Sequence, residues 1–181
     1  MPELPEVQSI INDLEKVLKG KIMQSVDCYY PGTVIADEPL KANPFPARVW
    51  DIKRRGKYII ITLEKDNALI IHLRMTGKLI YDNFCREPLK YERARIILEE
   101  GKVLHFMDIR TFGKIVICEQ KNIDNYLPPL GLEPFSDNFT ANALKEKLKG
   151  KKAPVKIVLM DQRIIAGLGN IYVCEILYRA G

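Results

Sequence analysis

The feature that most constrains the fold of this chain is a change of hydrophobic pattern at the proline-rich segment from Leu127 to Pro134. Before this segment, short apolar runs separated by polar turns fill most of residues 21–119. After it, apolar residues recur at helical spacing. Strands and helices bury apolar side chains with different periods, so one type of element cannot account for both halves. The pattern predicts a β-rich domain over residues 1–127, a linker over residues 128–139 and a helical region over residues 140–181.

The β-rich part contains two predicted hairpins and a further strand. Tyr58–Leu63 and Ala68–Leu73 flank a polar turn, as do Ala94–Leu98 and Lys102–Phe106, and another strand is expected at Gly113–Cys118. Short strands at regular intervals with turns between them indicate a sandwich or a barrel.

An N-terminal helix is predicted from about residue 4 to Leu18, because Pro5 is tolerated in a first turn and a row of apolar residues follows at helical spacing. The acids Glu3 and Glu6 suit the positive end of the helix dipole. Three more helices are expected, at residues 140–149, 154–160 and 170–179. The row of apolar residues in the N-terminal helix consists of Val7, Ile10, Ile11, Leu14, Val17 and Leu18.

The composition permits a domain with a substantial core, since 47% of the 181 residues are hydrophobic. No apolar stretch approaches the length of a membrane span. The cysteines Cys28, Cys85, Cys118 and Cys174 form no CxxC pair, so the sequence predicts neither a zinc site nor a disulfide framework. These features favour a reducing cytoplasm, and we expect no membrane partner and no small-molecule cofactor.

The basic residues are clustered, although the net charge of +5 says little by itself. Residues 53–57 carry four positive side chains, and residues 145–163 carry seven against two acids. Each run alone is typical of a solvated surface. Facing each other across a cleft, the two runs could follow the phosphates of two nucleic-acid strands.

The first seven residues, MPELPEV, could carry chemistry as well as begin a helix. Removal of the initiator methionine would leave Pro2 as a free secondary amine, and the pKa of an α-amino group is about 8. An unprotonated amine can attack an electrophilic carbon and form an iminium. Glu3 and Glu6 share one side of the first turn, so one could act as acid or base and the other could hold the amine. Taken alone, these residues are better explained as the start of a helix than as catalytic groups.

The glycine-rich segment Gly167–Tyr172 leads into a predicted helix. Backbone N–H groups at a helix start bind anions, and glycine lets a phosphate come close. Asn170 could cap this helix and donate its amide to the same phosphate, although a plain cap is the simpler interpretation.

Met75, Arg110 and Phe112 lie at predicted strand ends or in loops. In an extended chain, Arg110 and Phe112 would share one face. A Met and a Phe are usually core residues, but exposed together with an arginine they suit a wedge pushed between stacked bases.

Taken together, six motifs resemble the formamidopyrimidine-DNA glycosylase (Fpg) family, whose members remove oxidised purines from damaged double-stranded DNA. The resemblance runs from Met1 to Gly181. It implies an α+β fold in which a two-layer β-sandwich with flanking helices precedes a partial helix–two-turn–helix region. The motifs are MPELPEV at 1–7, RRGKY at 54–58, HLRMTG at 72–77, DIRTFG at 108–113, LGLEP at 130–134 and LMDQ…GLGNIY at 159–172.

The resemblance implies catalytic roles for four residues. Pro2 matches the nucleophile that attacks C1′ and expels the damaged base, after which the iminium permits β- and δ-elimination. Glu3 matches the acid that assists sugar opening, and Glu6 matches the acid near the nucleophile. Lys57 matches a catalytically important lysine near the lesion phosphates.

A second set of residues matches the family's DNA-binding positions. Met75, Arg110 and Phe112 match residues that fill the hole left by the flipped base. Lys156 and Asn170 match residues that bind phosphates, and Glu175 falls where the family also has a glutamate.

The family pattern also includes more of the helical domain and a C-terminal zinc finger with two CxxC pairs, which these 181 residues do not contain. Zinc would belong to that finger, so no metal is expected here. We expect a monomer in the bacterial cytosol. Two alternatives stay open. One is an endonuclease VIII-like glycosylase for oxidised pyrimidines, which Leu4 disfavours because that branch usually carries glycine there. The other is a catalytically poor DNA-binding fragment.

Overall fold

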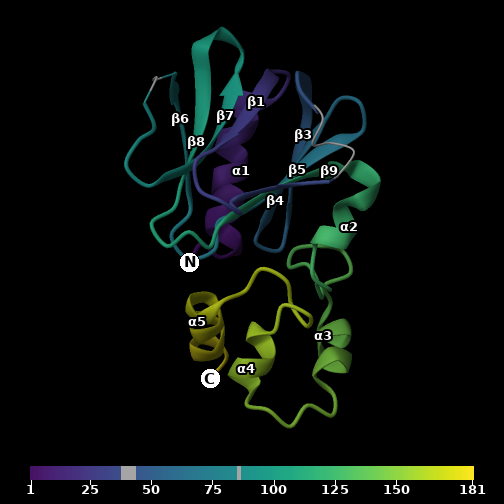
Figure 1. The fold of residues 1–181 in the computed structure, drawn as a ribbon. Helices are drawn as coiled ribbons and strands as arrows, with labels where there is room; N and C mark the ends of the chain where they lie inside the picture. Colours follow the sequence, from purple (N-terminus) through teal and green to yellow (C-terminus); the bar gives the residue numbers. More distant parts are fainter. Residues whose placement is uncertain (38–43, 85–86) are drawn as a thin grey trace.

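The structure, a computed structural model, describes residues 1–37, 44–84 and 87–181, so Cys85 lies outside it. A β domain stands above a smaller helical part, and a linker joins them (Figure 1). The predicted elements are confirmed to within two residues at their ends. The helices and longer strands are α1 (Leu4–Leu18), β1 (Ile22–Cys28), β2 (Val34–Ala36), β3 (Ala47–Arg55), β4 (Tyr58–Leu63), β5 (Asn67–His72), β6 (Lys78–Asn83), β7 (Glu92–Leu98), β8 (Lys102–Met107), β9 (Lys114–Glu119), α2 (Ile123–Tyr126), α3 (Ala141–Leu148), α4 (Val155–Met160) and α5 (Asn170–Ala180).

The expected mixed α+β fold is confirmed, and the two layers of the sandwich belong to one sheet. Among the described residues, nine strands are hydrogen-bonded in the order β2-β9-β5-β4-β3-β1-β7-β8-β6. The layers join where β1 pairs with β3 at only two positions, Ile22 with Arg48 and Met23 with Ala47. This short junction lets the sheet fold over on itself.

The core lies between the two layers and is closed by α1. Alternate residues of β4, namely Ile59, Ile61 and Leu63, are fully buried, as the period of a strand with one face inward requires. Phe106 contributes from the other layer to the same cluster. The apolar stripe of α1 joins this cluster, so the sandwich fixes the position of the N-terminal segment.

The helical part has a small core of its own, in which Val158, Ile165 and Val173 are buried. It meets the linker through a bridge between Leu132 and Ile165. No helix among the described residues is both long and apolar enough to cross a bilayer.

The first basic run is largely engaged within the protein. Arg54 and Arg55 both bind the carboxylate of Glu133, with 2.7 Å from Arg55 Nη1 to Oε2, and the backbone N–H of Gly56 donates to the same oxygen. Lys53 pairs with an acid on its own strand. The sequence left this run as a solvated surface or, if it faced the second run across a cleft, a track for phosphates, and neither interpretation included these internal contacts. Arg54 and Arg55 instead hold the linker against β3.

We expect Glu133→Gln to lower the free energy of unfolding by about 2 kcal/mol, because two largely covered guanidinium groups would lose their carboxylate. Urea denaturation followed by circular dichroism measures this change. The matched control is Asp13→Asn, which breaks an exposed pair with Lys16 and should cost less than about 0.5 kcal/mol. If both variants lose the same free energy of unfolding, the contact of Glu133 with Arg54 and Arg55 does not stabilise the attachment of the linker to the sandwich.

Candidate active site

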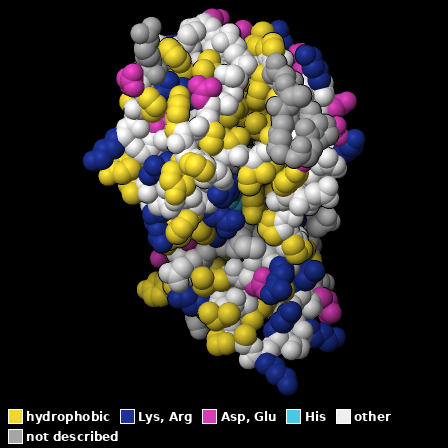
Figure 2. Space-filling view, viewed as in Figure 1, with side chains coloured by type: hydrophobic (Ala, Val, Ile, Leu, Met, Phe, Trp, Pro, Cys, Tyr) yellow, Lys and Arg dark blue, Asp and Glu magenta, His cyan; other side chains and the backbone are white. Residues whose placement is uncertain are grey.

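A pocket of about 450 Å³ lies where the β domain meets the helical part. The β domain contributes Met1, Glu3, Lys57 and Met75, and the helical part contributes Gly169 and Asn170 among others. The N-terminus lies at this junction (Figure 1), and Figure 2 shows basic side chains gathered at the same level of the molecule. The structure thus brings together residues from four of the sequence motifs.

The carboxylate of Glu3 is buried and accepts three backbone N–H groups at the start of α5. Gly169 N lies 2.8 Å and Tyr172 N 3.2 Å from Oε2, and Ile171 N lies 2.9 Å from Oε1. These are the orphan donors of a helix N-terminus, where a negative charge is favoured. Glu3 therefore caps α5 from the other end of the chain. Asn170 does not cap it, which corrects the expectation from the sequence: the N-cap is Gly169, and no side chain of its own segment caps the helix.

Two glycines permit this close approach. A Cβ on Gly169 would lie 2.5 Å from the Glu3 carboxyl carbon, and one on Gly167 would lie 2.8 Å from Leu4 Cδ1. Gly167 also has a φ of +90°, which disfavours other residues. In addition, Leu4 N donates to the Gly167 carbonyl at 3.0 Å. The glycines predicted to admit a phosphate thus also admit the N-terminal segment itself.

Glu6 links the same two segments. Its Oε2 accepts the Glu3 N–H at 2.9 Å, and Glu3 and Glu6 together form a capping box for α1. Its Oε1 accepts the Tyr172 hydroxyl at 3.0 Å. Both glutamates beside Pro2 are thereby held in place by α5, and Pro2 itself is half-buried between the exposed Met1 and the buried Glu3.

Lys57 is a buried lysine that lines the pocket. Burial lowers the pKa of its ammonium group below the usual range, and the negative charge of Glu3 partly opposes this shift. A lysine whose proton is more easily lost can exchange protons with a substrate more readily than an exposed one.

His72 is a site neighbour that the sequence reasoning did not single out, although the motif HLRMTG contains it. It ends β5, its ring lies 4.4 Å from that of Tyr58, and its Nδ1 accepts the Arg74 N–H at 3.0 Å. Burial lowers the pKa of the imidazole to about 4, helped by the positive charges of Arg74 and Lys57. The sequence feature that could have identified His72 is a single histidine at the end of an apolar predicted strand.

We expect His72 to make the protein less stable at acid pH. Its folded pKa of about 4 lies below the unfolded value of about 6.5. Between these values only the unfolded state binds the proton, so the free energy of unfolding falls as pH falls. From about pH 7 to about pH 4.5, wild type should lose about 2 kcal/mol more than His72→Gln. Urea unfolding at each pH measures this difference, and parallel profiles would contradict it.

Met75 lines the pocket from one loop, whereas Arg110 and Phe112 lie on a second loop and do not line it. All three side chains are exposed. The loop from Asp108 to Gly113 is not extended, since Thr111 has a φ of +61°, so the shared face that an extended chain would give Arg110 and Phe112 does not apply here. The turn still brings the residues together: the Arg110 guanidinium lies 5.0 Å from the centre of the Phe112 ring.

The remaining predicted DNA-binding residues lie on the helical part. Lys156 is half-buried on the short helix α4, while Asn170 and Glu175 are exposed on α5. Of these three, only Asn170 lines the pocket.

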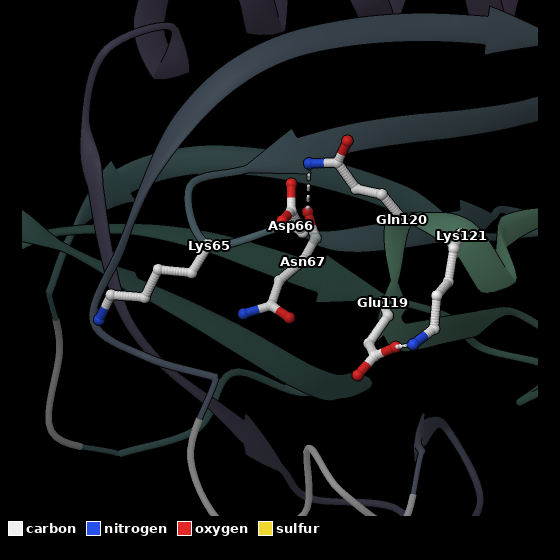
Figure 3. Close-up of a pocket in the computed structure, with 6 residues that line it drawn as sticks. All are labelled: Lys65, Asp66, Asn67, Glu119, Gln120 and Lys121. Carbon is white, nitrogen blue, oxygen red and sulfur yellow. Dashed lines mark hydrogen bonds and ion pairs between the residues drawn. The ribbon is translucent and has the colours of Figure 1, made fainter.

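A second pocket, of about 400 Å³, lies at the turn between β4 and β5 and the end of β9 (Figure 3). Gln120 Nε2 donates to the Leu63 and Asn67 carbonyls at 3.0 and 3.3 Å, and Lys121 pairs with Glu119 at 2.5 Å. These contacts close the hairpin, and none of the predicted site residues lines this pocket. Within the described ranges, no group of three His, Cys, Asp or Glu side chains could hold a metal ion.

Two family models match the chain, one described as "Formamidopyrimidine-DNA glycosylase N-terminal domain" over residues 1–115 and one as "Formamidopyrimidine-DNA glycosylase H2TH domain" over residues 130–181. Curated relatives named formamidopyrimidine-DNA glycosylase include those of Rippkaea orientalis, 38% identical, and Moorella thermoacetica, 36% identical. Each match covers 100% of this chain and 68% of the relative.

Solved structures give the same result. The Lactococcus lactis enzyme bound non-covalently to DNA containing an AP site has a TM-score of 0.89 and 33% identity, covering 97% of this chain and 68% of that one. A complex between Lactococcus lactis Fpg and abasic-site DNA has a TM-score of 0.87 and 32% identity, covering 97% and 66%. The chain thus spans about two thirds of the length of the relatives it matches.

Proposed function

The chain belongs to the formamidopyrimidine-DNA glycosylase family, a family of DNA-repair glycosylases, and from this premise we propose that it acts in base-excision repair as a combined glycosylase and AP lyase for oxidised purines. The observation that carries the proposal is the fixing of Glu3 by the N-terminus of α5. This contact places the residue next to the N-terminal amine in the wall of the pocket that Lys57 also lines.

The chemistry begins with the amine of Pro2, freed by removal of Met1. Its nitrogen bonds to C1′ while the bond from C1′ to the base nitrogen breaks, and the base leaves after gaining a proton. The Pro2 nitrogen gives up its own proton to the Glu3 carboxylate, and we assign to Glu3 the transfer of this proton to the ring oxygen, which opens the sugar, while the leaving base takes its proton from water. The nitrogen lone pair then forms the iminium with C1′.

The iminium acidifies the sugar and makes the strand break possible. Loss of a C2′ proton expels the 3′ phosphate, and a further proton loss expels the 5′ phosphate. Lys57 is suited to carry these protons, because its ammonium group is buried and its pKa is lowered. Glu6 positions the amine through its bond to the Glu3 N–H.

Duplex DNA is proposed to lie along the junction between the two parts of the molecule. The pocket would receive the flipped nucleotide, and Met75, Arg110 and Phe112 would fill the space that it leaves. Lys156 and Asn170 are proposed to bind phosphates from the helical part. Two solved relatives carry AP-site or abasic-site DNA, which supports this arrangement.

Borohydride trapping tests the proposal. Duplexes containing 8-oxoguanine, an oxidised pyrimidine or an abasic site are incubated with the protein at low salt, where phosphate contacts are strongest. We expect a covalent complex with the 8-oxoguanine and abasic duplexes. Preferential trapping of the pyrimidine duplex would favour endonuclease VIII-like specificity, and no trapping of any duplex would leave a DNA-binding role at most.

A further inference from the structure

Asp108 is a buried acid, 1% exposed, that none of the roles above uses. We propose that it is a positioning residue, which fixes the Met75 loop (residues 73–77) and the 108–113 loop to each other so that their exposed side chains enter a duplex as one unit. The inference rests on the proposed function, because it concerns how the wedge is held.

The Asp108 carboxylate binds both loops at once. Its Oδ2 accepts the Gly113 N–H at 2.7 Å, and its Oδ1 accepts the Arg110 N–H at 3.2 Å. The Thr76 hydroxyl, from the other loop, donates to the same Oδ1. Thr76 Oγ1 in turn accepts the Arg110 N–H at 3.1 Å. Three donors on one buried carboxylate make a strong, directional junction.

The backbone of Asp108 is itself anchored to the sheet. Its N–H donates to the Tyr91 carbonyl at 3.0 Å, and its carbonyl accepts Nε of Arg93 at 2.6 Å. The carboxylate therefore projects from a fixed point directly after the end of β8. By binding the two loops, the carboxylate therefore fixes their positions relative to the sandwich.

The wedge side chains cannot be positioned by packing. Met75 is 45% and Phe112 51% exposed, so no core holds them. Each loop also contains a non-glycine residue in the left-handed region, Arg74 at φ +54° and Thr111 at φ +61°. Such backbone persists only when its surroundings impose it. Among the described residues, the hydrogen bonds that join the two loops meet at one point, where the Thr76 hydroxyl donates to Asp108 Oδ1 and accepts the Arg110 N–H.

Amide hydrogen exchange of the free protein tests the coupling without DNA. Asp108→Asn keeps the shape but replaces one accepting oxygen by a donor, and we expect exchange at both loops to become about tenfold faster. Thr76→Val removes only the bridging hydroxyl and should also affect both loops, so it serves if Asp108→Asn folds poorly. Asp137→Asn, at an exposed linker acid, should affect neither. If both Asp108→Asn and Thr76→Val speed exchange only in residues 108–113, the proposed coupling between the two loops is overturned.

Measuring extrusion of the damaged base tests whether the positioning of the wedge side chains by Asp108 matters for entry into DNA. A fluorescent 2-aminopurine beside the lesion reports unstacking, and we expect Asp108→Asn to slow its signal about tenfold. Trapping of an abasic site opposite a one-nucleotide gap, where no base must be displaced, should fall less than about threefold. Equal losses in the two assays would indicate a general structural role and overturn the proposal. If wild type itself neither traps nor unstacks, the proposed function fails, and the exchange result alone decides whether Asp108 couples the loops.

Discussion

Replacing Pro2 by glycine is expected to reduce borohydride trapping of abasic DNA about 100-fold, equivalent to about 3 kcal/mol of transition-state stabilisation. A secondary amine gives an iminium that has no N–H proton to lose and stays electrophilic. Glycine gives an imine that must first be protonated, and its backbone lacks the fixed φ of proline. The half-buried setting of Pro2 between Met1 and Glu3 makes that rigidity useful. Single-turnover trapping over time, with the free N-terminus verified by mass, measures the effect.

Pro5→Gly is the matched control for this prediction. Pro5 lies in the first turn of α1, three residues beyond Pro2, and does not line the pocket. Its replacement should alter trapping less than about threefold, because only helix propensity changes. Equal losses at the two prolines would mean that the helix start, and not the amine, accounts for the effect.

Glu3→Gln is expected to produce the second large effect, on stability and activity together. Whichever way the new amide is oriented, its NH2 group faces at least one of the N–H donors of Gly169, Ile171 and Tyr172. We expect the free energy of unfolding to fall by about 3 kcal/mol, since a charged acceptor of three bonds is lost at a buried site. Trapping should fall by more than about 100-fold, because the group proposed to transfer a proton is also removed.

Glu15→Gln on the same helix controls for the loss of charge and should change neither quantity appreciably. Urea unfolding and trapping are measured on the same preparations. A Glu3→Gln protein that is destabilised but traps normally would limit Glu3 to holding α5. Normal stability together with lost trapping would contradict the capping role seen here.

The sequence predicted the elements well where the determining contacts are local. The hairpin of β4 and β5 follows from alternation within a few residues of a tight turn, and α1 follows from its own apolar stripe. The α+β class was confirmed for the same reason. That the two layers are one continuous sheet depends on the two pairs between β1 and β3, which no local pattern encodes.

The candidate site was predicted less completely, because its contacts join distant parts of the chain. Glu3 binds residues more than 160 positions away, so the sequence indicated Asn170 as the cap of α5. For Arg54 and Arg55 the sequence left open a solvated surface or a track for phosphates, since nothing local reveals that Glu133 binds them. Lys57 and Met75 were singled out through the motifs that contain them and not through their spacing, and the structure brings both to one pocket.

The measurement that most directly tests the central claim is mass-spectrometric mapping of the trapped complex. The protein is reduced onto abasic DNA, both components are digested, and the modified peptide is sequenced. The account predicts a deoxyribose remnant on the nitrogen of Pro2 in the N-terminal peptide, with Met1 absent. An adduct on Lys57 or another lysine, with the Pro2 amine free and unmodified, would contradict it.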